Sequence, residues 1–278
     1  MRYIGLTAAL LACCLIIPTF TSGQPPRTSG NSLMLYDDFR GPRIDPAKWS
    51  DFDAAQGDLD IAREVIPPSE GQSEARNGQL HLLEQSYSSP WDDNGEAYGY
   101  IALAFANPAP IKEVAFSLSA RNSAVSQCQS NPGNESSAWA GFTGRMFNYG
   151  GGLDPDEDVS ASIQLNRGSS NPTGALTVSA TVSTGGPLAF WNLQQMGTIK
   201  PGHTAKLRVK WDQGNKQFLF QLDNDAPVAI PYTVDDSSAP YYQLKAIEVG
   251  HGVPDCTTQP TGSTMMDAYF DNVYIGVQ

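Results

Sequence analysis

Short segments in which apolar and polar residues alternate constrain the fold of this chain more than any other feature. Between Val159 and Asn166 every second residue is apolar, and serine, glutamine and asparagine occupy the positions between. Successive side chains of a β-strand point to opposite faces, so this segment predicts a strand that faces a core on one side and water or a ligand on the other. Residues 176–182 and 205–211 repeat the pattern.

Turn residues separate these segments at the spacing typical of β-sandwiches. Asp212–Asn215 is such a turn and is predicted to fold residues 206–211 onto 218–222 as a hairpin. Helical periodicity is nearly absent, although residues 51–66 could hold one short helical turn around Ala62–Glu64. The sequence therefore predicts an all-β fold, a two-sheet antiparallel jelly-roll sandwich.

The first 23 residues read as a signal peptide. Arg2 precedes an apolar run from Leu6 to Ile17, and Thr21–Gly23 offers small residues for cleavage. The run is shorter than the roughly 20 residues that a membrane-spanning helix needs. We therefore expect a protein that is secreted, to the extracellular space or a periplasm, with residues 24–31 as a disordered arm and 32–278 as one domain.

An alternative stays open at Cys13, because Leu10–Cys13 resembles the cleavage box of bacterial lipoproteins. Lipidation there would attach the protein to a membrane, which is otherwise not expected as a partner. The chain has 29 Asp and Glu against 17 Lys and Arg, a formal net charge of −12. This excess argues against binding to nucleic acid or to an anionic membrane surface.

Two cysteines are predicted to form a disulfide. Cleavage of the signal peptide removes Cys13 and Cys14, and leaves Cys128 and Cys256 in polar segments of an exported domain. Exported proteins meet an oxidising environment, which favours a bond between them. The alternative is two unrelated thiols, one of them buried.

Three stretches resemble a known superfamily. Leu33–Trp49 contains Asp-Asp-Phe, a Gly, Ile-Asp-Pro and a Trp, Asn77–Leu82 reads Asn-Gly-Gln-Leu-His-Leu, and Tyr269–Ile275 reads Tyr-Phe-Asp-Asn-Val-Tyr-Ile. They are similar to the first, second and closing strands of the concanavalin A-like lectin/glucanase superfamily. Its members include laminarinase-type glycoside hydrolases and non-catalytic laminin G-like jelly rolls. The resemblance implies that the opening strand (33–40) and the closing strand (269–277) are antiparallel neighbours.

The chain departs from the enzymes of this group at the catalytic strand. Those enzymes carry two glutamates and an aspartate on one strand face, as nucleophile and acid/base. The matching face here holds only neutral side chains: Ser160, Ser162, Gln164 and Asn166. Asp154, Asp156 and Asp158 precede that strand, in a segment predicted to be a solvated loop, with a weak cation loop or a divergent catalytic set as alternatives. The sequence therefore predicts no catalytic residue, and absence of hydrolase activity is the expectation.

The resemblance also implies a structural calcium ion, held by positions that match Asp38, Gly78 and Asp271. Calcium accepts a mixture of carboxylate and carbonyl oxygens. The alternative is that the two aspartates hydrogen-bond turns where the terminal strands meet.

A carbohydrate-binding surface is the leading functional hypothesis. Aromatic rings stack on the apolar faces of sugars, and amides bind the hydroxyl groups. The candidates are Trp91, Tyr98, Tyr100, Gln164, Asn166 and Trp191. For any one aromatic residue the alternative is that it caps the core at the rim of the sandwich. We therefore expect a secreted, non-enzymatic module that binds a glycan, with a divergent glycoside hydrolase or a structural, protein-binding module as alternatives.

Overall fold

The computed structural model describes residues 33–52, 59–66, 78–90, 92–171 and 174–277, the side chains of 59–66 excepted. The predicted signal peptide, the arm at 24–31 and Cys13 lie outside these residues. In the part of the chain that is described, no helix is long and apolar enough to cross a membrane.

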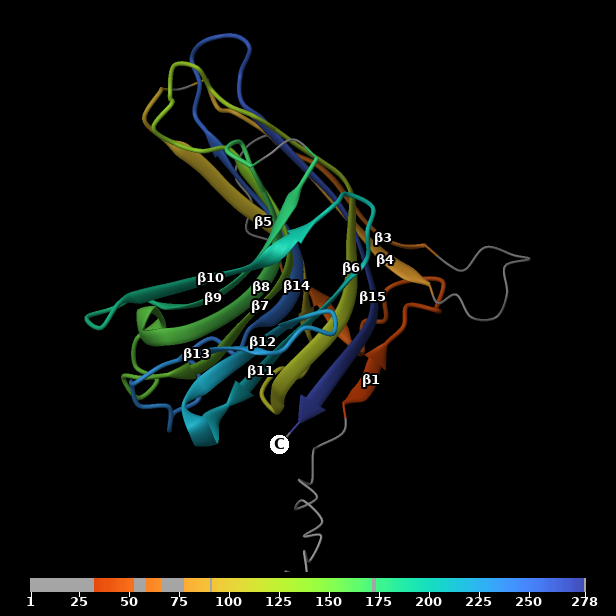
Figure 1. The fold of residues 1–278 in the computed structure, drawn as a ribbon, viewed down its shortest axis with the longest axis vertical. Coiled ribbons are helices and arrows are strands. Elements are labelled where there is room, and N and C mark those ends of the chain that lie inside the picture. Colours follow the sequence, from red (N-terminus) through yellow and green to blue (C-terminus); the bar gives the residue numbers. More distant parts are fainter. Residues whose placement is uncertain (1–32, 53–58, 67–77, 91, 172–173, 278) are drawn as a thin grey trace, which may run out of the picture. The chain divides into compact units, whose positions relative to one another are not determined.

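The described residues form two antiparallel sheets (Figure 1). One has eight strands in the order β13-β12-β11-β6-β15-β4-β3, with β1 also paired to β15, and the other has seven in the order β10-β9-β8-β7-β14-β5-β2. The strands are β1 (Met34–Asp37), β2 (Trp49–Asp51), β3 (Leu59–Ile66), β4 (Gln79–Tyr87), β5 (Glu96–Phe105), β6 (Ile111–Ser126), β7 (Ser137–Asn148), β8 (Asp158–Gly168), β9 (Leu176–Thr184), β10 (Phe190–Ile199), β11 (Ala205–Asp212), β12 (Gln217–Leu222), β13 (Val228–Pro231), β14 (Lys245–Pro254) and β15 (Ser263–Val277). The predicted all-β jelly roll is confirmed.

Alternation along each strand builds the core between the sheets. In β8 the apolar residues Val159, Ala161, Ile163 and Leu165 have no exposed surface, whereas the polar residues between them are half-buried on the other face. β11 and β12 alternate in the same way and pair through Leu207↔Leu222 to Asp212↔Gln217, so the predicted hairpin is confirmed. Burying one such large apolar side chain contributes about 1.5–3 kcal/mol. The largest buried side chains include Phe142, Phe147, Phe218, Phe220 and Phe270.

The terminal strands are neighbours, as the resemblance implied. β1 pairs with β15 antiparallel, from Met34↔Ile275 to Asp37↔Val273. Asp37 then fixes the turn that follows: its Oδ1 accepts the backbone N–H of Phe39 at 3.0 Å and its Oδ2 accepts Nε1–H of Trp49 at 2.8 Å. Trp49 is thereby buried against Phe39, with ring centroids 5.9 Å apart.

The possible helical turn at Ala62–Glu64 is wrong. These residues belong to β3, which pairs with β4 from Leu59↔Ser86 to Ile66↔Gln79. Local helix propensity is a weak preference, and a full ladder of hydrogen bonds to β4 overrides it.

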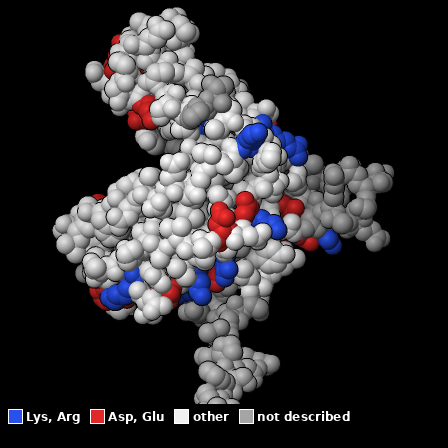
Figure 2. All heavy atoms as spheres, viewed as in Figure 1, with Lys and Arg blue, Asp and Glu red and all other residues white. Residues whose placement is uncertain are grey.

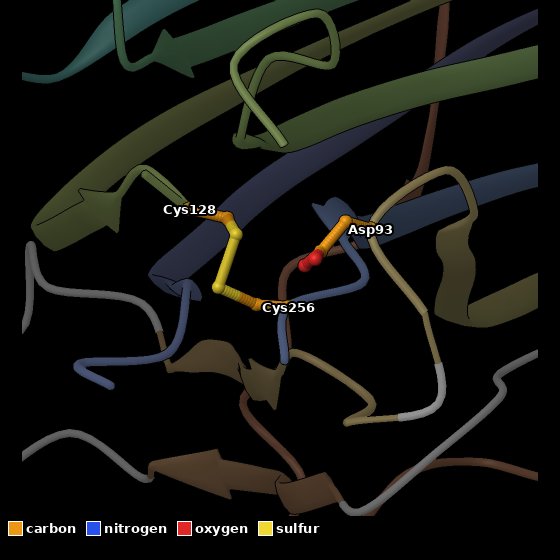
Figure 3. Close-up of side chains that lie close together, drawn as sticks. All are labelled: Asp93, Cys128 and Cys256. Atoms are coloured by element: carbon orange, nitrogen blue, oxygen red, sulfur yellow. A yellow bond between two sulfur atoms is a disulfide. The ribbon is translucent and has the colours of Figure 1, made fainter. Parts of the chain in front are cut away.

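The predicted disulfide is confirmed. Cys128 and Cys256 are bonded, with Cα atoms 5.6 Å apart and no exposed surface on either residue (Figure 3). The bond lies two residues beyond the ends of β6 and β14, so it ties one strand of each sheet together at the same end of the sandwich.

Lys and Arg do not gather in one patch on the face drawn in Figure 2, where they lie interspersed with Asp and Glu.

Candidate functional site

A groove of about 520 Å³ crosses the outer face of the seven-stranded sheet. Strands β5, β7, β8, β9, β10 and β14 each contribute lining residues to it. Because side chains alternate, the residues that line the groove are the ones between the core residues on each strand. The lining residues are Tyr98, Tyr100, Ser137, Trp139, Thr143, Arg145, Ser160, Ser162, Gln164, Asn166, Ser179, Thr181, Ser183, Trp191, Leu193, Leu244 and Glu248.

The groove brings together five of the six predicted carbohydrate-binding residues: Tyr98, Tyr100, Gln164, Asn166 and Trp191. The sixth, Trp91, lies outside the described residues. Trp191 is 70% exposed and Tyr98 is 56% exposed, so neither ring is used to cap the core. Their common location was not implied by sequence spacing, because they come from β5, β8 and β10.

The face of β8 that lines the groove is the neutral row Ser160, Ser162, Gln164 and Asn166. Two of these side chains are already held in place. The Asn166 amide donates to Ser179 Oγ at 2.6 Å, and the Gln164 amide donates to Glu248 Oε1 at 3.1 Å. The row therefore offers positioned hydroxyl and amide groups, and it contains no carboxylate.

Trp139 also lines the groove and is not among the residues predicted from the sequence. Its indole lies over Gly250 of β14, where a Cβ atom would come within 2.5 Å of the ring. Glycine at that position lets the ring lie close to the sheet. The Tyr98 ring is 6.0 Å from Trp139, centroid to centroid, so the two form one aromatic surface.

Glu248 is the one carboxylate among the described residues that line the groove. It is 7% exposed, and its Oε1 accepts hydrogen bonds from Thr143 Oγ1 at 2.8 Å, Gln164 Nε2 at 3.1 Å and Trp139 Nε1 at 3.3 Å. Burial raises the pKa of the Glu248 carboxyl, although the three donors oppose this rise. A carboxyl group with a raised pKa suits a general acid.

Glu248 is not among the residues predicted from the sequence, although the sequence contains a signal for it. Outward positions of β14 are Ala246, Glu248, Gly250 and Gly252, and they alternate with inward residues such as Ile247 and Val249. A single carboxylate among small residues on one face of a strand is predicted to point away from the core, with little side-chain volume around it.

A second cavity of about 620 Å³ adjoins the groove. Tyr100, Arg145 and Leu244 line both. Phe52 lines the second cavity and stacks on Tyr100, with centroids 6.0 Å apart and planes at 21°. The aromatic surface therefore continues beyond the groove.

The acidic residues 154–158 are not among the residues that line the groove. Asp154 caps a short 3₁₀ turn, Pro155–Glu157, by accepting the N–H of Asp156 at 2.9 Å. Asp158 is 3% exposed and binds Arg145 Nη1 at 3.1 Å and Asn148 Nδ2 at 3.0 Å. The role of Asp158 is therefore structural, whereas the prediction placed it in a solvated loop.

The three positions suggested for calcium lie at one junction of the eight-stranded sheet. A Cβ on Gly78 would lie 1.7 Å from the Phe39 carbonyl oxygen, so residue 78 contacts the end of the opening segment. Asp271 lies on β15 between its pairing with β4 at Phe270 and its pairing with β1 at Val273. The Asp38 carboxylate binds Arg40 Nε at 3.1 Å.

The group Asp93, Cys128 and Cys256 places a carboxylate near two sulfur atoms (Figure 3). The sulfur atoms are joined in the disulfide, so they do not serve as metal ligands. The Asp93 carboxylate accepts the N–H of Thr257 at 2.8 Å and the Thr257 hydroxyl at 2.7 Å. A hydrogen bond from Ser130, and then these two from Thr257, lower the pKa of Asp93.

No protein-family model and no curated protein matches the chain. Solved structures with a similar arrangement include a β-glucanase from Bacillus licheniformis, with a TM-score of 0.48 and 9% identity over 90% of this chain and 99% of that one. A laminarinase from Flavobacterium sp. UMI-01 has a TM-score of 0.44 and 12% identity over 89% of this chain and 100% of that one. A GlcNAcα1-4Gal releasing endo-β-galactosidase from Clostridium perfringens has a TM-score of 0.41 and 12% identity over 90% of this chain, which spans 64% of that one. These are enzymes of the group that the sequence motifs resemble.

Proposed function

We propose that the groove on the seven-stranded sheet binds a carbohydrate chain. The observation that carries the proposal is the composition of its lining. The aromatic rings of Tyr98, Trp139 and Trp191 come from three strands and lie beside rows of hydroxyl and amide side chains from β8 and β9. Sugars present apolar C–H faces to aromatic rings and hydroxyl groups to polar side chains, so they match both halves of this surface.

The groove is also preorganised, which favours binding of a polar ligand. Gln164 and Asn166 are held by Glu248 and Ser179, and Trp139 is held by Glu248. These side chains lose little conformational freedom when a ligand arrives. The disulfide supports the further proposal that the protein acts outside the reducing cytoplasm.

A glycan array with the wild-type protein and the Trp191→Ala variant tests the binding proposal. Trp191 is exposed, so its removal leaves the fold intact and is expected to weaken glycan binding at least about fivefold through loss of stacking. Tyr87→Ala is the matched control, because Tyr87 is an exposed aromatic residue on β4 and does not line the groove. Absence of any bound glycan, or equal binding by Trp191→Ala, contradicts the proposal.

Hydrolysis of the bound chain is the second candidate, and Glu248 is the observation that favours it. A buried carboxyl with a raised pKa can protonate a leaving group. Glycoside hydrolysis ordinarily also needs a second carboxylate, as nucleophile or as base for water. Among the described lining residues no second carboxylate is present, so the lining by itself supports binding.

Release of reducing ends from a panel of polysaccharides distinguishes the two candidates. We expect binding without release. Release that Glu248→Gln abolishes, while glycan binding persists, would establish hydrolysis. The glutamine keeps an oxygen acceptor for Trp139 and Thr143 and removes the proton that a general acid must donate.

A further inference from the structure

Arg145 lies where the groove and the adjoining cavity meet, and it lines both. One edge of its guanidinium is fixed: Nη1 donates to Asp158 Oδ2 and to the Pro155 carbonyl oxygen, each at 3.1 Å. The Tyr242 ring lies beside the guanidinium, with its centroid 5.2 Å from Cζ. The plane of the guanidinium is therefore set before any ligand arrives.

Asp158 extends this support to the wall of the second cavity. Its Oδ1 accepts the backbone N–H of Tyr241 at 2.6 Å, and its Oδ2 accepts that of Tyr242 at 3.0 Å. Asp158 is buried, so its carboxylate interacts with these two N–H groups and with Arg145 and has little contact with water. The same carboxylate thus positions both the cation and the aromatic residue next to it.

The opposite edge of the guanidinium is available. Within the described residues neither Nε nor Nη2 of Arg145 has a hydrogen-bond partner, and neither atom is enclosed by protein. The side chain is 32% exposed. Nε and Nη2 present two parallel N–H groups, which is the geometry that binds both oxygens of a carboxylate.

The rest of the lining contributes almost no opposing charge. Glu248 is the one carboxylate among the described lining residues of the two cavities, and its Oε1 already accepts three hydrogen bonds. The whole chain has a formal net charge of −12. Apart from Asp158, which is buried and pairs with Nη1, the surface around Arg145 is therefore poor in carboxylates, in a protein that is otherwise rich in them.

We propose that the groove takes a polysaccharide containing uronic acid, whose carboxylate binds the Nε–Nη2 edge of Arg145. This inference rests on the proposed carbohydrate-binding function and names the class of carbohydrate. It assigns Arg145 a role in specificity: the stacking residues hold the chain, and Arg145 selects a carboxylate at the junction of the two cavities.

Binding to polygalacturonate and to its methyl-esterified form is the test, because the two share one backbone and differ in the charge of the carboxyl groups. Alginate, a sulfated galactan and a neutral β-glucan complete the panel. We expect a uronate polymer to bind at least about tenfold more tightly than its neutral counterparts at low salt, with the difference shrinking as salt is added.

Arg145→Lys keeps the charge and loses the paired N–H groups, so it is expected to lower uronate affinity about tenfold or more. Arg145→Gln is expected to abolish the preference for the charged form. Lys206→Gln, which removes one positive charge from β11 of the other sheet, is the control and is expected to bind as the wild type does. Thermal unfolding of each variant shows whether the fold is retained, and Arg145→Lys keeps the test decisive if Arg145→Gln unfolds.

Three outcomes overturn the inference. Equal binding of the esterified and free polymers, or tighter binding of the neutral β-glucan, removes the role of Arg145 and leaves the carbohydrate-binding proposal standing. Tighter binding of the sulfated galactan than of both uronate polymers would mean that Arg145 selects a sulfate group, which contradicts the proposal. Absence of binding to every polymer overturns the carbohydrate-binding function as well.

Discussion

At the scale of single residues, Glu248 and Lys245 each place an ionisable group where little water reaches it. Both belong to β14, Glu248 on the groove face and Lys245 on the inward face. Lys245 is 2% exposed, and its Nζ donates to the Pro108 carbonyl oxygen at 3.0 Å. Removing a charge from water disfavours the charged form, so the two pKa values move in opposite directions.

Glu248 is expected to make the protein less stable as pH rises. Burial raises the folded-state pKa above the ordinary value of 4.5, so the protonated carboxyl stabilises the fold below that value. This contribution is lost as pH rises through the folded-state pKa. A glutamine at position 248 does not ionise, so the unfolding free energy of Glu248→Gln does not fall in this way. The difference in unfolding free energy, Glu248→Gln minus wild type, should therefore increase with pH. Denaturant titrations between about pH 4 and 8 measure this difference, and a gain that stays constant across the range would contradict the expectation.

Lys245 is expected to give the opposite slope at alkaline pH. Burial first, and then the positive charge of Lys112, lowers the pKa of Lys245 from 10.5 to about 8. Between these two values the unfolded chain binds the extra proton, so the unfolding free energy rises with pH in that window. At neutral pH the buried ammonium costs about 3 kcal/mol.

Lys245→Met should therefore stabilise the protein at pH 7 by about 2–3 kcal/mol and flatten the rise at alkaline pH. Lys206→Met is the control, because Lys206 is exposed. Unfolding titrations at several pH values decide the matter. An unchanged slope in Lys245→Met would mean that Lys245 is not the group that titrates.

At the scale of elements, the disulfide joins the ends of β6 and β14 and with them the two sheets. The two cysteines are 128 residues apart, so the bond closes a long loop in the unfolded chain. The chain-entropy model gives such a bond about 4–5 kcal/mol. The double variant Cys128→Ser/Cys256→Ser should lose stability of that order in denaturant titrations.

A reducing agent provides the control for this prediction. A reductant reaches the buried disulfide when the chain unfolds, and it should then lower the unfolding free energy of the wild-type protein. The unfolding free energy of the double variant should not change. A variant within about 1 kcal/mol of the oxidised protein would show that native-state strain offsets the entropic gain.

Regular alternation decided which elements could be predicted. β8 was predicted because its apolar and polar residues alternate without interruption from Val159 to Asn166. β3 was mistaken for a turn because its pairing with β4 is a long-range contact that local sequence does not carry. Along β14 every residue is buried, and most outward-facing residues are alanine or glycine. The two faces of the strand therefore differ little in hydrophobicity, and the alternation did not identify Glu248. The groove itself needed the register of six strands, which the sequence does not specify.

At the scale of the whole molecule, the junction of β1, β4 and β15 remains the proposed calcium site. Its proposed ligands are Asp38, Gly78 and Asp271, and Gly78 lies against the Phe39 carbonyl that follows β1. A ligand that binds only the native state raises stability by mass action. We expect excess chelator to lower the melting temperature of the protein, and added calcium to restore it. Asp271→Asn should make the melting temperature insensitive to both, whereas a wild-type protein that ignores chelator would show that no such site matters.

The position of β15 has a consequence for how the protein is made. This strand lies between β6 and β4 and also pairs with β1, and all three precede it in the sequence. While the chain is being synthesised, β4 and β6 therefore present unpaired edges until residues 263–277 emerge. Unpaired edges are templates for association with other chains. A chaperone that covers them, or passage through a membrane before folding, would protect the nascent chain until its last strand closes the sheet.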